Sequence, residues 1–128
     1  MNIQIPGVDL DKAVELFEDD IDLFVTVARS YVSSIPAVLD KIRLIENQMI
    51  ENQNVSAAPL ADYAVSMHSI KGTCQAIAAE ETRKAALNLE QMAKAGNVSG
   101  ILAENQVFLK QADKLIDDIR KWLKQFDA

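Results

Sequence analysis

The residues best suited to chemistry lie close together in the sequence MHSIKGTCQ, at positions 67–75. His68 is the single histidine of the chain, with Lys71 three residues later and Gly72 four residues later. A neutral imidazole is a nucleophile and histidine titrates near neutral pH, so His68 could accept a phosphoryl group. On a helix, a lysine one turn away could neutralise the added charge, and a glycine would leave the imidazole open to an incoming group. The same pattern also fits an ordinary surface histidine, so the spacing alone leaves both interpretations open.

A helix with Pro59 in its first turn is expected to position this histidine. Apolar residues at steps of three and four predict the side that packs into a core: Leu60, Tyr63, Met67, Ile70, Cys74 and Ile77. At about 100° per residue, His68 points about 130° away from the centre of that stripe and should face solvent. Its outward side carries mostly small residues, where another protein could approach closely: Ala61, Ala64, Val65, Gly72, Gln75 and Ala79.

Two helices are expected before the one that carries His68. Residues 1–8 suggest an extended lead-in, and Asp9 can cap a short helix that ends at the acidic residues 18–20. Asp20 can cap the next helix and place negative charge at its N-terminus.

The second of these helices is long, because one apolar stripe keeps its phase from Ile21 to Met49. Pro36 lies inside it and removes one backbone hydrogen bond. We therefore expect a kink at Pro36, with two separate helices as the alternative. A loop is expected at residues 51–58.

Two further helices are expected after the one that carries His68. Glu80 and Glu81 favour the start of the first, and Gly96 followed by Asn97 favours its stop. Ser99 is the expected cap of the last helix. Both segments carry apolar residues at helical spacing, and no strand pattern competes with them.

Four amphipathic helices joined by short loops must bury their apolar stripes against one another. The sequence therefore predicts an all-α fold, an antiparallel four-helix bundle with a short N-terminal helix. We find no repeat, low-complexity tract or linker, so residues 1–128 are expected to form a single domain. Nothing indicates a dimer seam, and a monomer is expected.

The composition excludes several classes of function. Lys and Arg number 13 against 19 Asp and Glu, which gives a net charge of -6, and no basic cluster interleaves with aromatic residues, so nucleic acid is not expected as a partner. The chain has 1 cysteine, Cys74, expected in the core, so no internal disulfide or paired metal ligands are available. A reducing cytoplasm is the simplest expectation. The chain has neither a signal peptide nor a run of 18 apolar residues, so no membrane span is expected.

Longer segments resemble a known family. HSIKG at 68–72, followed by LNLEQMAKAGN at 87–97, is similar to the histidine phosphotransfer (HPt) domains of bacterial multistep phosphorelays and of chemotaxis histidine kinases. The opening GVDLDKAVELFEDDIDLFVTVARSYV resembles the N-terminal region of these domains, and Pro36 lies where they often have a proline. The resemblance covers essentially the whole chain.

The resemblance implies specific roles for individual residues. His68 matches the phosphorylated histidine, Lys71 the lysine that neutralises the phosphoryl group, and Gly72 the glycine that admits a receiver domain. Glu90 matches a Gln or Glu whose side chain accepts a hydrogen bond from the imidazole Nδ1, which leaves Nε2 free to attack. By periodicity alone, Glu90 would be an exposed carboxylate. Lys94 matches a position that can be basic and could assist with the phosphoryl charge.

The sequence also departs from the family pattern. Ala78 stands where the family usually has glycine, ten residues after the histidine, so the junction between the two helices could be shaped differently. Thr73 and Cys74 replace the small residues that often follow the glycine. Gln75 faces the same way as His68 and is expected at the polar rim of the partner surface.

The function implied by the resemblance is that of a phosphoryl carrier without a cofactor of its own. Its partners would be receiver domains of response regulators or a hybrid histidine kinase, and the receiver would supply Mg²⁺. The closest alternative is a phosphotransfer domain of a chemotaxis-type kinase, labelled directly by an ATP-binding domain. A third possibility is a helical adaptor that binds through the alanine-rich surface around His68 and never carries phosphate. The chain could be a free-standing protein or an excised domain.

Overall fold

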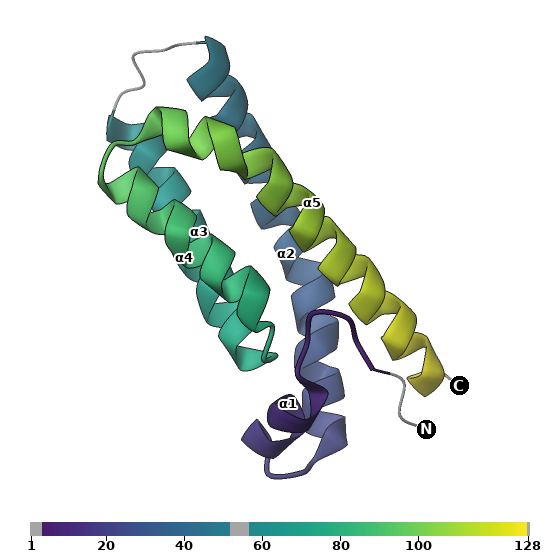
Figure 1. The fold of residues 1–128 in the computed structure, drawn as a ribbon. Coiled ribbons are helices and arrows are strands. Elements are labelled where there is room, and N and C mark those ends of the chain that lie inside the picture. Colours follow the sequence, from purple (N-terminus) through teal and green to yellow (C-terminus); the bar gives the residue numbers. More distant parts are fainter. Residues whose placement is uncertain (1–3, 52–56, 128) are drawn as a thin grey trace.

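A computed structural model describes residues 4–51 and 57–127, and every regular element in these ranges is helical (Figure 1). The elements are α1 (Leu10–Leu16), α2 (Ile21–Glu51), α3 (Ala57–Ala76), α4 (Glu80–Lys94), α5 (Val98–Leu123) and a short 3₁₀ helix, η1 (Lys124–Phe126). The all-α prediction is confirmed. α3 packs along α4 and α2 along α5, with further contacts between α4 and α5 and between α2 and α3.

The start of the chain follows its expected capping pattern. The Asp9 side chain accepts a hydrogen bond from the Lys12 backbone N–H and begins α1. Glu18 and Asp19 both adopt positive φ angles, which end the helix. Asp20 then accepts from the first backbone N–H groups of α2. The acidic run therefore stops one helix and caps the next, as predicted.

Residues 21–51 form one continuous helix, so the alternative of two helices is wrong. Pro36 has no N–H to offer the carbonyl of Val32, which lies one turn earlier. The Arg120 guanidinium of α5 donates to this carbonyl at 3.3 Å. A cation from a neighbouring helix thus replaces the missing backbone donor. A bend of the axis at Pro36 stays a prediction.

α2 is the one helix within the described residues that is long and apolar enough to cross a membrane. The core helix of a water-soluble protein can also be this long and apolar, and a third of the most apolar 18 residues of α2 is buried within the protein. The apolar stripe of α2 faces the protein interior at residues that include Phe24, Ala28, Tyr31, Ile35, Leu39, Ile42 and Met49.

α3 begins at Ala57, two residues before Pro59, which lies in its first turn as expected. Glu51 and Ala57 are helical rather than part of a loop, and residues 52–56 lie outside the described ranges. The expected stripe is confirmed, because Tyr63, Met67, Ile70, Cys74 and Ile77 are all buried. Leu60, at its start, is half-buried against the same core.

The junction between α3 and α4 corrects one prediction. Ala78 takes a left-handed backbone with φ 56°, and the N–H of Ala79 bonds back to the carbonyl of Cys74 at 2.9 Å. The helical phase therefore stops at Ala76. Ala79, expected on the outward side of the helix, is fully buried because the chain turns inward there. The carbonyl of Ala78 accepts from the N–H of Asp9, so the junction also holds the start of α1.

α4 begins at Glu80 as predicted, and Gly96, with φ 71°, follows its end. The predicted cap of α5 is wrong by two residues. The Asn97 side chain accepts from the N–H of Gly100, whereas Ser99 lies within the first turn and donates its hydroxyl to Asn97. At the other end of α5, Trp122 packs edge-on against Phe24, with ring centroids 5.4 Å apart, and contacts Phe126.

A small polar cluster interrupts the core between α2, α3 and α5. Tyr63 and Asn105 are both fully buried, and the Tyr63 hydroxyl donates to Asn105 Oδ1 at 2.6 Å. Asn105 Nδ2 has no hydrogen-bond partner among the described residues. Glu46, also buried, accepts from Gln106 nearby. Burial and the neighbouring Glu46 carboxylate raise the pKa of Tyr63, so this hydroxyl remains a hydrogen-bond donor.

Candidate functional site

The candidate site lies where α3 and α4 pack side by side (Figure 1). Met67 and Ile70 are fully buried and fix the rotation of α3, so His68 points outward with 68% of its side chain exposed. Lys71, one turn later, is largely covered. Glu90 and Lys94 come from α4. The exposed position predicted for His68 is confirmed.

The Glu90 carboxylate connects the other three side chains. His68 Nδ1 lies 2.9 Å from Glu90 Oε2. Lys71 Nζ donates to the other oxygen, Oε1, at 2.8 Å. Lys94 Nζ lies 3.3 Å from Oε2, the oxygen that also faces the imidazole. Two lysines and a histidine therefore converge on a single glutamate that is only 3% exposed.

The protonation state of Glu90 follows from these contacts. Burial raises its pKa, but hydrogen bonds from Lys71, His68 and Lys94 outweigh burial and lower the pKa of Glu90 to about 2. The side chain is therefore a carboxylate at neutral pH, and a carboxylate can only accept hydrogen bonds. His68 Nδ1 must carry the shared proton. In the neutral ring this leaves a lone pair on Nε2, the nitrogen suited to attack an electrophile.

Glu90 is the residue that periodicity assigned wrongly, since it predicted an exposed carboxylate. The resemblance implied its contact with the imidazole, and the structure contains that contact. A signal was present in the sequence, because Ala86, Glu90 and Ala93 share one face of α4 at steps of four and three, and all three are buried. A charged residue inside an apolar stripe indicates that a partner of opposite charge faces it.

The other residues expected on the partner surface are mostly accessible. Val65, Gly72 and Gln75 are exposed, as are Ala61 and Lys94, whereas Ala64 is half-buried and Ala79 is buried.

Gly72 has no packing role within the described part of the chain. A Cβ built on it would meet no atom within 4 Å among these residues. A close contact inside the protein therefore does not explain a glycine in mid-helix, where glycine costs about 1 kcal/mol relative to alanine.

A shallow groove runs beside His68 between α3 and the C-terminal end of α4. It has a volume of about 470 Å³ and is lined by Leu60, Ala61, Ala64, Ala93, Lys94 and Gly96. Ala64 lies one turn before His68 on the same helix, and Lys94 contacts the carboxylate that binds the imidazole. The groove and the imidazole are therefore parts of one surface.

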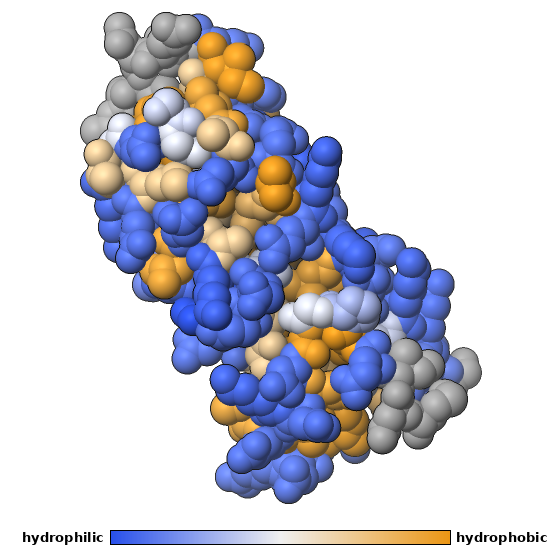
Figure 2. Space-filling view, viewed as in Figure 1, coloured by the Kyte–Doolittle hydropathy of each residue, from blue (hydrophilic) through white to orange (hydrophobic). Residues whose placement is uncertain are grey.

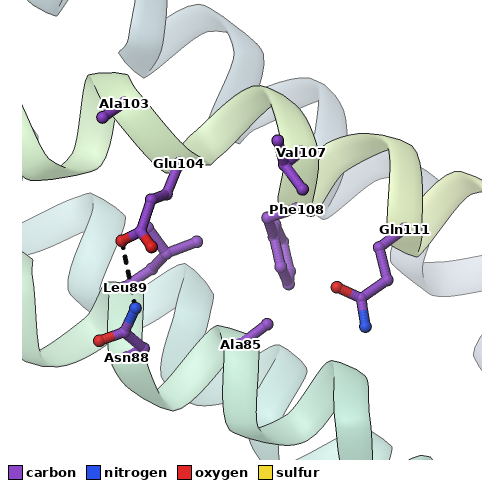
Figure 3. A pocket seen from close by; sticks show the side chains of 8 residues that line it. All are labelled: Ala85, Asn88, Leu89, Ala103, Glu104, Val107, Phe108 and Gln111. Atoms are coloured by element: carbon purple, nitrogen blue, oxygen red, sulfur yellow. Dashed lines mark hydrogen bonds between the residues drawn. The ribbon is translucent and has the colours of Figure 1, made fainter.

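A second hollow, of about 190 Å³, lies between α4 and α5, and Figure 3 shows its lining. Leu89 and Phe108 are its buried apolar residues, and a hydrogen bond from Asn88 to Glu104 spans one end. At 100° per residue, Glu90 points to a different side of α4 from Asn88. This hollow is therefore separate from the His68 site. In the space-filling view the visible face is mostly hydrophilic, with hydrophobic residues showing between the hydrophilic ones in the middle and at both ends (Figure 2).

Cys74 belongs to the core, as predicted. It is fully buried, its sulfur lies 3.7 Å from the Tyr31 hydroxyl, and burial raises the pKa of its thiol to about 11. Within residues 4–51 and 57–127, no group of three or more His, Cys, Asp or Glu side chains could hold a metal ion.

Comparisons with known proteins give no relative: no family model matches the chain, and neither the curated proteins nor the solved structures contain a match.

Proposed function

We propose that this protein is a histidine phosphotransfer protein of two-component signalling. His68 would accept a phosphoryl group from the aspartate of one receiver domain and pass it to the aspartate of another. The observation that carries the proposal is the pairing of an exposed imidazole with a buried carboxylate, at 2.9 Å from Nδ1. The similarity of HSIKG and LNLEQMAKAGN to HPt domains adds to it.

The transfer step uses the protonation state described above. Nε2 attacks the phosphorus of the aspartyl phosphate, a nitrogen–phosphorus bond forms, and the bond to the aspartate oxygen breaks to leave a free carboxylate on the receiver. Nδ1 keeps its proton, so the ring becomes cationic and faces the negative charge of Glu90. Transfer to the second receiver reverses these changes. Little further chemistry is needed from the bundle, because positioning and charge stabilisation dominate phosphoryl transfer and the receiver supplies Mg²⁺.

The surroundings of the imidazole suit this exchange. Lys71 lies on the same helix and can screen the phosphoryl charge without a change of backbone. The open space at Gly72 and the small side chains of Ala61 and Ala64 leave room for a protein active site. A cytoplasmic monomer is part of the proposal.

The proposal includes the finer fold, in which α2 to α5 form an antiparallel four-helix bundle. Ion pairs between α2 and the last part of the chain support it. Arg29, early in α2, pairs with Asp127, and Arg43, later in α2, pairs with Asp113. This order fits helices that run in opposite directions.

The direct test is transfer from receiver domains of the source organism that carry a radioactive phosphoryl label on aspartate. The wild-type protein should acquire a label that is lost in acid and stable in alkali, as expected of a phosphoramidate. The His68→Gln variant should acquire none while keeping the same helical circular dichroism spectrum. Label on the folded His68→Gln variant would overturn the proposal.

The carboxylate of Glu90 favours a second candidate function, that of a phosphotransfer domain in a chemotaxis-type kinase. HSIKG and Glu90 both resemble that branch of the family. An isolated ATP-binding kinase domain plus ATP, without any receiver, would then label His68. Labelling only from phosphorylated receivers would exclude this candidate.

A further inference from the structure

The two lysines that contact Glu90 are held differently. The Lys71 side chain is 23% exposed, and its Nζ lies 2.8 Å from Glu90 Oε1, which neither His68 nor Lys94 contacts. Lys94 is 66% exposed and lies at 3.3 Å from Oε2, which it shares with the imidazole. Exposed ion pairs contribute little free energy because solvent screens them. Lys94 can therefore leave the carboxylate at small cost, whereas Lys71 is fixed.

Lys94 also belongs to the groove beside His68, and it is the one charged side chain among the described residues that line this groove. The rest of the lining consists of Leu60, three alanines and a glycine. A segment that fits such a lining has an apolar face. Charge complementarity requires a carboxylate where that segment passes Lys94.

We propose that Lys94 is a docking-sensitive positioning residue, which a carboxylate on the apolar segment of the receiver that enters the groove draws away from Glu90. This inference rests on the proposed function. In the free protein, Lys94 shares Oε2 with His68 Nδ1 and weakens the pull of that oxygen on the proton. Once Lys94 pairs with the receiver, Oε2 interacts with Nδ1 alone and electron density shifts toward Nε2. The imidazole thus becomes a better nucleophile only when a partner is in place.

Three variants separate this role from a general effect of charge. Lys94→Met removes the ammonium group and keeps a long side chain, and Lys94→Arg keeps the charge. Lys84→Met removes an exposed lysine from another part of α4 and is the matched control. Each variant is compared with the wild type by nitrogen NMR of the imidazole, by labelling with phosphoramidate, and by transfer from the labelled receiver that reacts fastest with the wild type.

The expected results differ between the small donor and the receiver. Phosphoramidate does not fill the groove, so Lys94→Met should react with it about twofold faster or more, because Oε2 is already free. From the receiver, the same variant should show a KM raised by about fivefold with kcat unchanged or higher, since it loses the pair with the partner. The Nδ1 resonance should move on receiver binding in the wild type and change little in Lys94→Met. Lys94→Arg should resemble the wild type, and so should Lys84→Met.

Other outcomes overturn the inference. Slower labelling of Lys94→Met by phosphoramidate would show that Lys94 stabilises the phosphoryl group rather than restraining Glu90. If Lys94→Met has the same KM for the receiver as the wild type, and its Nδ1 resonance moves as much on receiver binding, Lys94 takes no part in docking. If the wild type instead acquires no label on His68 from any receiver or from phosphoramidate, the proposed function itself fails and the inference fails with it.

Discussion

The Glu90 carboxylate should make the stability of the protein depend on pH in a way that a single substitution removes. In the folded protein, three donors from His68, Lys71 and Lys94 hold the pKa of Glu90 at about 2, compared with an ordinary value of 4.5. A group whose pKa is lowered by folding stabilises the protein above its ordinary pKa and loses that contribution as the pH falls toward the folded value. The affected interval therefore runs from about pH 4.5 down to about pH 2. Glu90→Gln cannot titrate there.

The size of the effect follows from the same contacts. A fall in pKa from 4.5 to about 2 corresponds to an upper bound of about 3 kcal/mol, at about 1.4 kcal/mol for each pH unit. Lys94 is 66% exposed, so solvent screens part of this energy. We therefore expect the wild type to lose about 1 to 2 kcal/mol relative to Glu90→Gln over this interval.

Urea unfolding followed by circular dichroism measures the effect at a series of pH values between about 2 and 7. The quantity of interest is the difference in free energy of unfolding between the wild type and Glu90→Gln. The other carboxylates titrate in both proteins and largely cancel. Glu81→Gln, which removes an exposed carboxylate from the same helix, is the control and should give a nearly constant difference.

One result would refute the reasoning. If the difference for Glu90→Gln stays constant from about pH 5 to about pH 2, the three donors do not stabilise the charged form of Glu90. The assignment of the shared proton to Nδ1 would then lose its basis. If high salt reduces the change with pH in the free-energy difference between the wild type and Glu90→Gln, the ionic origin of the effect is supported.

Further predictions concern the backbone and the core. Ala78 adopts a left-handed conformation that strains an alanine, so Ala78→Gly should raise the free energy of unfolding by up to about 1 kcal/mol. The control Ala76→Gly, at the helical end of α3, should lower the free energy of unfolding by a similar amount. Equal effects of the two substitutions would contradict the strain at Ala78. Tyr63→Phe and Asn105→Leu should each cost about 1 to 3 kcal/mol because each leaves a buried polar group unpaired. The double variant should recover much of that loss, and strictly additive costs in a double-mutant cycle would show that the two side chains are independent. Burial raises the pKa of Cys74 to about 11, so a thiol reagent near pH 8 should label it only after unfolding, and rapid labelling of the native protein would contradict its buried position.

Periodicity predicted the features that depend on one helix at a time. The spacing of Tyr63, Met67 and Ile70 was enough to predict which side of α3 is buried and that His68 is exposed. In a regular helix, the spacing of two residues in the sequence fixes the angle between their side chains. The capping of α1 and α2 by Asp9 and Asp20 was equally local, since each cap bonds to N–H groups within three residues.

The features that periodicity missed depend on departures from a regular helix or on contacts between helices. Ala79 is buried because Ala78 takes a conformation that alanine seldom adopts, and no glycine marks the turn. Glu90 is buried as a charged group because cations from α3 and α4 meet it, and such pairing lies outside any single helical pattern. Asn97 and Ser99 are both good capping residues two positions apart, so composition could not choose between them.

The position of Trp122 has a spectroscopic consequence. It is the single tryptophan of the chain, and its aromatic contacts are Phe24 of α2 and Phe126 of η1, neither of which belongs to α3 or α4. Intrinsic tryptophan emission therefore reports on the packing of α2 against the end of α5. Phosphorylation or partner binding at His68 should change this emission very little. Optical measurements of partner binding need a label attached near the groove, whereas the natural fluorophore can follow unfolding without disturbing the imidazole.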